Sequence, residues 1–417
     1  MELTYKKIGL LIGFFALVVV MGFLLYALFF RAAPTPAVPS DSSVDDGSQL
    51  PQADSGSGGG IAPTDSGQLP SGATVGAETE GGQPLVQPGA IAGGGVTQTT
   101  LLSAANSLAP IVDASGNSVL YYNNANGTFE RAGQNAAPAP FSDKIFFNAQ
   151  KVTWAPSKRK AVIEYPDDSN IVYDFQTSRQ FSLPKHWQDF DFSPDSARII
   201  AKSIGSDPDN RWLVIANDDG SQAQALEPIG EKDATVYPSW SPNNLTVAMY
   251  SESIDFDRQR LYFVGLNGEN FKSTVIDGRG FEHQWDPAGE SIIYSVYSST
   301  SELKPTLWAV SAKGESIGAN RRPLELQTWA HKCAFANAQT LYCAVPDTLP
   351  EGAGLFPELA QTSTDSVYRV NLATGAKTLV AVPESGYAMA NIAVSEDGAA
   401  LYFTDALSGQ LRTMRLR

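Results

Sequence analysis

The side chains with the widest chemical range in this sequence are its three histidines, His186, His283 and His331. Imidazole rings bind metals, move protons and contact ligands near neutral pH. Each histidine stands shortly before one copy of a recurring turn, and aromatic residues occupy neighbouring positions: Trp187, Tyr237, Phe281, Trp329 and Tyr387. We interpret this set as an aromatic and imidazole rim around a ligand. For His283 the alternative is a packed, hydrogen-bonded position in the core.

No complete metal-binding motif accompanies these residues. The sequence has neither a Cys-x-x-Cys nor a His-Glu-x-x-His pattern, and no full EF-hand loop. Two acidic loops, residues 207–210 and 255–257, offer carboxylates for calcium but lack the full ligand spacing. We expect no catalytic centre, no metal site and no cofactor, with calcium in these loops as the alternative.

A repeated phrase predicts the scaffold that positions these side chains. An apolar or aromatic residue is followed by Ser-Pro-Asp-Gly, or a degenerate version of it, and then by a short β-branched run. Seven copies begin at Val112, Trp154, Phe192, Trp240, Trp285, Phe335 and Val394. They lie roughly 40–60 residues apart, and each unit has room for three or four short strands, as in propeller blades. The sequence predicts an all-β, seven-bladed β-propeller, with six or eight blades as alternatives.

Two of the copies carry a resemblance to a known family. Trp-Ser-Pro-Asn-Asn at 240–244 and Phe-Ser-Pro-Asp-Ser at 192–196 resemble the TolB-type propeller repeat, a relative of the WD repeat. The resemblance covers residues 97–417 and implies blades around a central channel. Similar blades also precede the catalytic domain of prolyl oligopeptidase-like enzymes, so the resemblance does not imply one function. The last repeat lacks its outermost strand, and we expect residues 97–102 to supply it and close the ring.

The first part of the chain predicts a membrane anchor and a tether. Residues 8–30 contain no charge and suffice for a helix across the ~30 Å hydrocarbon core. We interpret them as a signal anchor, with a cleaved signal peptide as the alternative. Lys6 and Lys7 precede the segment, which predicts that residues 1–7 are cytoplasmic and the propeller extracytoplasmic, in the periplasm or at the cell surface. Residues 31–96, rich in Gly, Pro and Ser, predict a disordered linker.

The charge and the cysteines limit the partners and the compartment. The formal net charge is −15 without a Lys/Arg block, so we expect no binding to nucleic acid through a basic patch. Cys333 and Cys343 lie symmetrically about the centre of a predicted hairpin. They are either a buried apolar pair or a cross-strand disulfide in an oxidising compartment. At equivalent positions of other repeats stand apolar pairs such as Val152 and Val162, which we expect to face each other.

Long loops are expected at one mouth of the ring, at residues 205–210, 253–257, 298–305 and 346–365. The last of them exceeds the ~12–15 residues above which a loop without secondary structure is usually functional or disordered. With Phe356 from the longest loop, the candidate binding face comprises His186, Trp187, Tyr237, Phe281, His283, Trp329, His331, Phe356 and Tyr387.

Three functions are compatible with this face. We favour an interaction or scaffold module that binds an unknown protein of the cell envelope. The alternatives are a propeller that binds glycans or the cell wall, and an enzyme such as a hydrolase or lyase that uses carboxylates at the mouth.

Overall fold

The computed structural model describes residues 14, 16–21, 23, 87–134 and 136–417. The chain divides into two compact units, Met1–Glu78 and Thr79–Arg417. In the first unit the described residues are helical. Among all the described residues, no helix combines the length and the apolar character needed to cross a membrane. The predicted tail 1–7, much of the predicted span 8–30 and the linker up to residue 86 lie outside the described residues.

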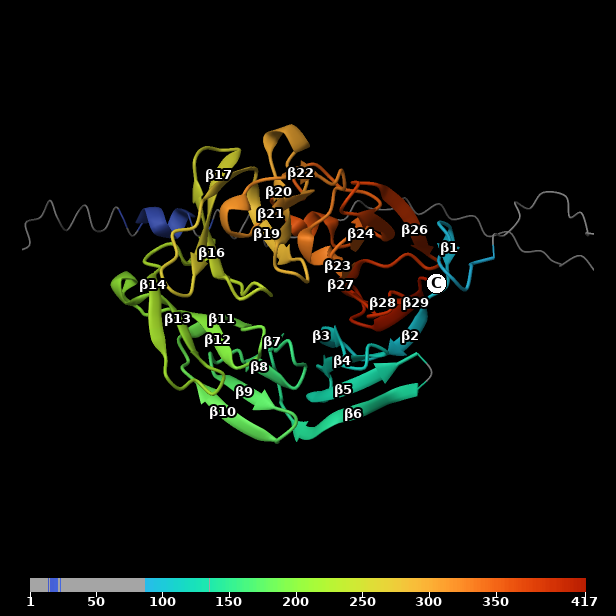
Figure 1. Cartoon of the computed structure of the whole chain (residues 1–417), viewed down its shortest axis with the longest axis horizontal. Coiled ribbons are helices and arrows are strands. Elements are labelled where there is room, and N and C mark those ends of the chain that lie inside the picture. Colours follow the sequence, from blue (N-terminus) through green and yellow to red (C-terminus); the bar gives the residue numbers. More distant parts are fainter. Residues whose placement is uncertain (1–13, 15, 22, 24–86, 135) are drawn as a thin grey trace, which may run out of the picture. The chain divides into compact units, whose positions relative to one another are not determined.

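The second unit is a seven-bladed β-propeller, which confirms the predicted fold class (Figure 1). Blade one consists of β3 (Ser107–Val112), β4 (Ser118–Asn123), β5 (Thr128–Gly133) and β6 (Ala136–Ile145). Blade two consists of β7 (Lys151–Trp154), β8 (Lys160–Glu164), β9 (Asn170–Asp174) and β10 (Arg179–Leu183). Blade three consists of β11 (Trp187–Phe192), β12 (Arg198–Ser203), β13 (Trp212–Asn217) and β14 (Gln224–Pro228). Blade four consists of β15 (Val236–Pro238), β16 (Thr246–Ser253), β17 (Arg258–Gly265) and β18 (Thr274–Asp277).

The remaining three blades complete the ring. Blade five consists of β19 (Arg279–Trp285), β20 (Ser291–Tyr297), β21 (Thr306–Ser311) and β22 (Arg322–Pro323). Blade six consists of β23 (Cys333–Asn337), β24 (Thr340–Pro346), β25 (Asp365–Asn371) and β26 (Lys377–Pro383), extended by β1 (Val96–Thr97). Blade seven consists of β27 (Met389–Val394), β28 (Ala400–Asp405), β29 (Leu411–Arg415) and β2 (Thr100–Ser103).

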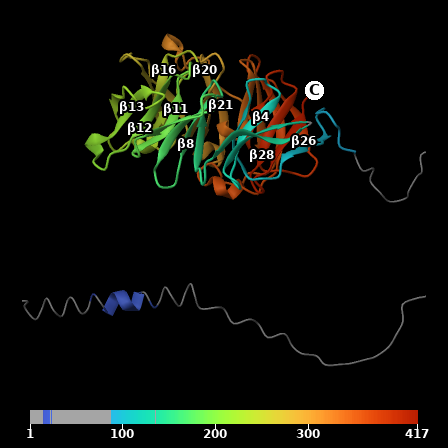
Figure 2. The ribbon, with the colours of Figure 1, turned by 90° about the horizontal axis from the view of Figure 1, so that it is seen from below.

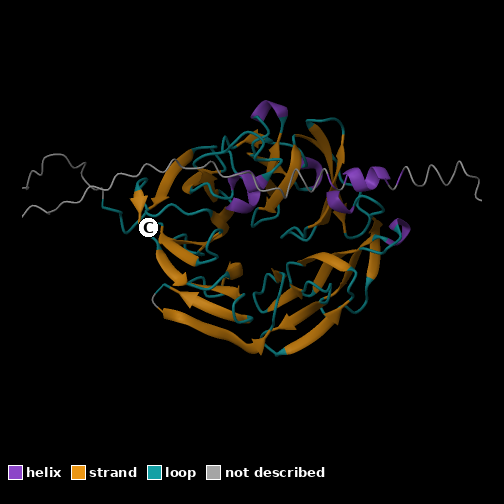
Figure 3. Ribbon diagram, turned by 180° about the vertical axis from the view of Figure 1, so that it is seen from behind, coloured by secondary structure: helices purple, strands orange, loops and turns teal. Residues whose placement is uncertain are grey.

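Six short 3₁₀ turns are found among the described residues, and they all lie in or between blades three to six (Figure 3). They are η1 (Pro208–Asn210), η2 (Asp233–Thr235), η3 (Ser299–Ser301), η4 (Gly314–Ser316), η5 (Ala330–Lys332) and η6 (Pro357–Ala360).

The repeated turn joins the first and second strands of each blade, and its polar side chains hold it closed. In blade four the Ser241 hydroxyl donates to Asn243 Oδ1 at 2.7 Å and accepts from the Thr246 amide at 2.9 Å. The corresponding bond recurs in blade seven, where the Ser395 hydroxyl donates to the Asp397 carboxylate at 2.6 Å. Such side chains offer the backbone local partners in a turn, which explains why these residue types recur there. These turns lie on one face of the ring, which we call the turn face.

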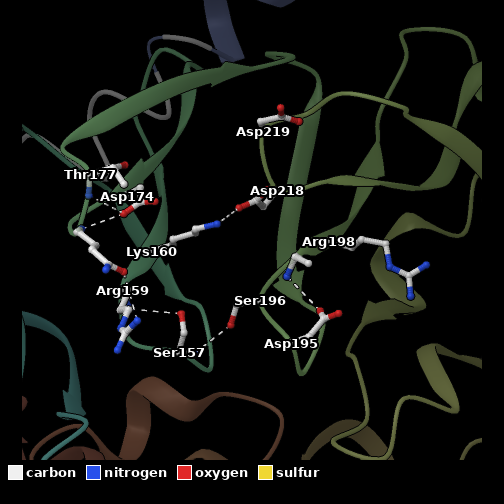
Figure 4. A network of polar contacts seen from close by, with 12 residues as sticks. Ser157, Arg159, Lys160, Asp174, Thr177, Asp195, Ser196, Arg198, Asp218 and Asp219 are labelled. Atoms are coloured by element: carbon white, nitrogen blue, oxygen red, sulfur yellow. Dashed lines mark hydrogen bonds and ion pairs between the residues drawn. The ribbon is translucent and has the colours of Figure 1, made fainter.

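Apolar side chains pack between neighbouring blades and form the core. Met249 and Ile276 of blade four, for example, pack with Phe281 and Ile292 of blade five. Polar contacts add to this packing on the turn face. Between blades two and three, Lys160 pairs with Asp218, and the Ser157 amide donates to the Ser196 hydroxyl at 3.0 Å (Figure 4). Each blade therefore depends on both neighbours for burial.

The ring closes with a strand from before blade one, as predicted. β2 pairs antiparallel with β29, with Thr100 opposite Thr413. Residues 92–96, which the predicted linker includes, instead pair with the propeller. β1 pairs parallel with β26, and the amides of Ala92 and Gly94 donate to carbonyl groups of Arg415 and Val380. Backbone groups can pair with an open sheet edge whatever their side chains, so the Gly-rich composition did not reveal this pairing.

Strand register departs from the repeat alignment in blade two. Val152 pairs with Ile163 and not with Val162, whose partner is Thr153. In blade three a bulge between Gln188 and Asp191 shifts the register. Turn length and bulges set the register, and the spacing of repeats shows neither.

The two cysteines stand directly opposite each other. Cys333 of β23 pairs with Cys343 of β24, their Cα atoms lie 4.0 Å apart, and a disulfide joins them. Both residues are buried.

Candidate functional site

The face opposite the turn face carries the long loops and the starts of the innermost strands, and we call it the mouth face. Figure 2 shows the ring from the side, with the strands running between the two faces. At the mouth face, residues of blades four, five and six line an open pocket of about 270 Å³. Six residues form most of its wall: Tyr237, Phe281, Glu282, Tyr297, Trp329 and Gly354. We call this cavity the mouth pocket.

Three of the predicted aromatic residues meet in this pocket, although they come from three blades. Tyr237 is the middle residue of β15 and Phe281 lies near the start of β19, and their ring centroids are 5.4 Å apart. Trp329 directly precedes η5, at the entry to blade six. Residues at the entries to successive blades converge because the blades are arranged around one axis.

His283 lies behind the pocket wall and stacks on Phe281, with ring centroids 5.2 Å apart. Its Nε2 atom shares a hydrogen bond with the Ser239 hydroxyl at 2.8 Å. Burial lowers the pKa of His283 to about 4. The imidazole is therefore neutral at pH 7, and the arrangement matches the packed, hydrogen-bonded interpretation.

His331 is exposed and belongs to the rim. Its Nδ1 atom lies 2.7 Å from Oε2 of Glu282, which is on the neighbouring blade. The Glu282 side chain is 40% exposed, and its Oε1 atom has no hydrogen bond or ion pair with another described residue. Burial raises the pKa of Tyr237, a hydrogen bond with Ser251 opposes this, and the charge of Glu282 adds to the rise. The mouth pocket thus combines aromatic walls with one carboxylate.

The loop between β24 and β25, which we call the blade-six loop, covers Trp329. Trp329 is only 6% exposed because it packs with Ala353 and Ala360 of this loop. The loop also reaches blade five: the amides of Gly352 and Gly354 donate to the carbonyl groups of Glu302 and Leu303 at 3.0 and 2.7 Å. Trp329 therefore anchors the loop instead of standing free at the rim.

Glycine allows the close approach of the blade-six loop to blade five. A Cβ atom on Gly354 would lie 2.5 Å from Cβ of Tyr297 and 2.6 Å from the Leu303 carbonyl oxygen. A Cβ atom on Gly280 would lie 2.4 Å from the Tyr297 ring. Side chains at these two positions would displace the wall of the mouth pocket.

Two mouth loops expose apolar side chains. In the blade-six loop, Leu355, Phe356 and Leu359 are 43%, 51% and 50% exposed. In the loop between β16 and β17, Ile254 and Phe256 are 43% and 66% exposed.

The loop between β20 and β21 connects these two. On one side its Ser299 amide donates to Asp257 Oδ1 at 2.8 Å, and on the other its Glu302 and Leu303 carbonyls hold the blade-six loop. Phe356, which the sequence predicted at this face, therefore belongs to an exposed apolar surface on connected loops.

The other predicted rim residues lie elsewhere. His186 is exposed and Trp187 is only 4% exposed, and both stand at the entry to blade three. Tyr387 lies under the Arg412 guanidinium, which is 4.6 Å from its ring centroid, beside Thr99. Tyr387 thus belongs to the contact between the closing segment and blade seven.

A second cavity of about 440 Å³ lies at the mouth between blades two and three, beside Trp187. Lys151 Nζ lies 2.9 Å from Asp189, and Lys202 lies 2.8 Å from the same carboxylate. Burial alone would lower the pKa of Lys151, but Glu164 and Asp189 outweigh it and raise that pKa. Sequence reasoning missed this network because its members come from four strands and form no local motif.

Another pattern that the sequence analysis missed is Gly-Glu-Ser-Ile-Gly at 314–318. It matches the Gly-x-Ser-x-Gly sequence pattern of a hydrolase nucleophile elbow. The structure places it between β21 and β22, in and after η4, and not between a strand and an α-helix. The Ser316 hydroxyl donates to the Lys313 carbonyl at 2.6 Å, and none of the described histidines bonds to it. The segment is a hairpin connection.

Carboxylates of the two acidic loops at 207–210 and 255–257 bond to groups in or directly beside their own loops. Asp207 caps η1 by accepting from the Asp209 amide, and Asp255 pairs with Arg258 at 2.6 Å. Among the described residues, no three His, Cys, Asp or Glu side chains gather as a metal site would require.

Comparison with known proteins supports the fold alone. No protein-family model matches the sequence, and no curated protein matches it. The structure is similar to an oligogalacturonate lyase in complex with manganese, with 11% identity, a TM-score of 0.50, and coverage of 76% of this chain and 91% of the other. It is also similar to the β-propeller domain of Cps50 (Swd1) from Myceliophteria thermophila, with 10% identity, a TM-score of 0.50, and coverage of 76% and 100%. At such identities the resemblance extends to the propeller architecture and not to an activity.

Proposed function

We propose that this chain is a binding module that holds a partner protein against the mouth face of its propeller. The observation that carries the proposal is the set of exposed apolar side chains on the connected mouth loops: Ile254, Phe256, Leu355, Phe356 and Leu359. Exposed apolar residues that gather on one face mark interaction sites. Large apolar and aromatic side chains also supply much of the binding energy of interfaces.

The same proposal places the propeller outside the cytoplasm on a membrane tether. Support comes from the uncharged segment 8–30 with Lys6 and Lys7 before it, and from the Gly- and Pro-rich composition that follows. The buried disulfide between Cys333 and Cys343 fits an oxidising compartment. The partner would then be a protein of the cell envelope.

Glycan binding and catalysis receive less support. Trp187 and Trp329 are 4% and 6% exposed, so neither offers an open stacking platform for a sugar. The oligogalacturonate lyase and the Cps50 (Swd1) propeller domain share the fold of this chain at 11% and 10% sequence identity. This similarity favours neither function.

The test uses full-length tagged protein captured from crosslinked native membranes. The informative variant replaces Leu355, Phe356 and Leu359 together by serine. Removal of residues 346–365 would also break a buried contact, because Asp365 at the start of β25 forms an ion pair with the buried Lys332 at 2.7 Å. The matched control is Leu245→Ser, since Leu245 is 40% exposed in a turn on the opposite face.

We expect the wild type and Leu245→Ser to enrich the same envelope protein, and the triple serine variant to lose at least about tenfold of that enrichment. Circular dichroism and thermal unfolding verify that each variant is folded. Equal enrichment by the triple variant would refute the assignment to this face. A folded wild type that captures no protein would refute the function itself.

A further inference from the structure

The mouth pocket lies directly beside the exposed apolar surface of the blade-six loop, because Gly354 of that loop forms part of its wall. A partner that covers Leu355 and Phe356 therefore also covers the pocket. Pockets for whole small-molecule ligands measure about 300–1,000 Å³. At about 270 Å³ the mouth pocket is below that range and suits one inserted side chain.

The walls of the pocket select the chemistry of that side chain. Tyr237 presents an aromatic ring, which attracts cations to its face and also packs against aliphatic stems, while Trp329 contributes the part of its surface that the blade-six loop leaves uncovered. Glu282 presents a carboxylate at the rim. One of its oxygen atoms is bonded to His331 at 2.7 Å, and the other has no partner among the described residues. Aromatic walls with one available carboxylate fit a long side chain that ends in a positive charge.

The charge of the loops around the pocket also favours a positively charged ligand. The four mouth loops, 205–210, 253–257, 298–305 and 346–365, contain nine carboxylates: Asp207, Asp209, Asp255, Asp257, Glu302, Asp347, Glu351, Glu358 and Asp365. Three of the nine are already paired: Glu302 with Lys304 at 2.5 Å, Asp255 with Arg258 at 2.6 Å and Asp365 with Lys332 at 2.7 Å. The other six have no ion pair among the described residues. The net charge of the whole chain is −15. A face of this kind attracts basic partners and repels acidic ones.

We propose that the mouth pocket accepts a lysine or arginine side chain presented by the partner protein, with Glu282 as its counter-ion. This inference rests on the proposed function, since the basic residue belongs to the protein that docks on the mouth loops. The aliphatic stem packs against Tyr237, and the charged head bonds to Glu282 Oε1. The basic side chain then acts as an anchor at the centre of the interface.

The experiment measures binding of four short peptides to the full-length protein in nanodiscs. The probes are acetyl-Gly-Gly-X-Gly-Gly-amide peptides in which X is arginine, lysine, citrulline or norleucine. Their binding is detected by saturation-transfer NMR and by competition between the peptides. Citrulline and norleucine keep the shape of the basic side chains and lack the charge. We expect binding of the arginine and lysine peptides and at least about tenfold weaker binding of the neutral pair, as for loss of a charged hydrogen bond.

Glu282→Gln and Glu351→Gln form the matched pair of variants. Both remove one negative charge, but Glu351 is an exposed residue of the blade-six loop outside the pocket wall. We expect Glu282→Gln to weaken the basic peptides about tenfold and Glu351→Gln to change them less than about twofold. Equal effects of the two variants, equal binding of neutral and basic peptides, or no binding of the basic peptides would each overturn the inference.

Failure of this inference is distinguishable from failure of the proposed function. If partner capture depends on Leu355, Phe356 and Leu359 but is unchanged in Glu282→Gln, the interaction function stands and the basic anchor is wrong. If the basic peptides bind through Glu282 but no partner protein is captured, the pocket chemistry stands and its assignment to a protein partner is wrong.

Discussion

Burial decides which single side chains at the mouth face are available for chemistry. His283 is partly buried, neutral at pH 7 and bonded to Ser239, whereas His331 is exposed and bonded to Glu282. Trp329 supports the blade-six loop and contributes only part of its surface to the pocket. The groups left for a ligand are therefore the ring of Tyr237 and the carboxylate of Glu282.

Asp191 is a titratable residue whose bonds join two blades. It lies in the innermost strand β11, where its carboxylate accepts from the Phe192 amide at 2.8 Å and from the Trp240 amide at 2.7 Å. The second bond links blade three to blade four. Burial raises the pKa of Asp191 to about 6, although the two amides and Lys151 act in the opposite direction.

We predict a fall in stability between about pH 4 and pH 6 that depends on Asp191. The folded chain keeps the proton up to about pH 6, whereas the unfolded chain releases it near pH 3.9. Because the folded state binds more protons in this range, the free energy of unfolding decreases as pH rises, by roughly 1.4 kcal/mol per unit of pKa difference. The contribution is fully present below about pH 4 and is lost above about pH 6.

The measurement is urea unfolding of wild type and Asp191→Asn at a series of pH values. The variant cannot ionise, so its free energy of unfolding relative to the wild type should rise steadily from pH 4 to pH 6 and then level off. A difference that is independent of pH would show that burial does not raise the pKa of this carboxyl.

At the scale of elements, the blade-six loop matters because it joins two blades and closes one side of the mouth pocket. Its position depends on Gly352 and Gly354, which bond to carbonyl groups of Glu302 and Leu303. Both acceptors have positive φ angles, 56° and 53°, so this backbone adopts an unusual conformation in order to receive the loop.

We predict that Gly354→Ala loosens the blade-six loop. The added methyl group would collide with Tyr297 and with the Leu303 carbonyl, so the loop must move away or the structure must absorb a strain of about 1–3 kcal/mol. Hydrogen exchange at the amides of residues 352 and 354 should become at least about tenfold faster.

Gly95→Ala is the control for this substitution, because a methyl group at Gly95 meets no atom within 4 Å. It should leave exchange in the blade-six loop unchanged. Equal exchange in Gly354→Ala and the wild type would mean that the contact with Tyr297 does not hold the loop.

At the scale of the whole molecule, a short N-terminal strand joins the last blade to the first. Leu102 of β2 is 6% exposed and packs with Val112 and Tyr121 of blade one and with Tyr402 and Leu411 of blade seven. Its neighbour Leu101 is 45% exposed. The two leucines share one strand, but only one of them contributes to the joint.

We predict that Leu102→Ala lowers the free energy of unfolding by about 2–5 kcal/mol, because it leaves a cavity where the ring closes. Leu101→Ala should change it by less than about 0.5 kcal/mol. Thermal and denaturant unfolding of the two variants test this directly. Similar effects of both substitutions would contradict the closure by β2.

The sequence by itself determined the all-β class, the seven blades and the strand that closes the ring. The repeated turn could show these because its Ser, Pro, Asp and Gly residues have local conformational roles, which do not depend on distant parts of the chain. The same logic predicted a hairpin centred between Cys333 and Cys343, which the structure contains. It also placed Tyr237, Phe281, Trp329 and His331 at one mouth.

Only the tertiary structure decided which of these residues meet and which are covered. Tyr237, Phe281 and Trp329 line one pocket, whereas Trp187 lies beside another cavity and Tyr387 in the closure of the ring. The partner of Val152, the pairing of β1 and the burial of Trp329 under its loop were likewise decided in three dimensions. These features depend on register, on bulges and on contacts between blades that are far apart in sequence, and local residue preferences do not encode such contacts.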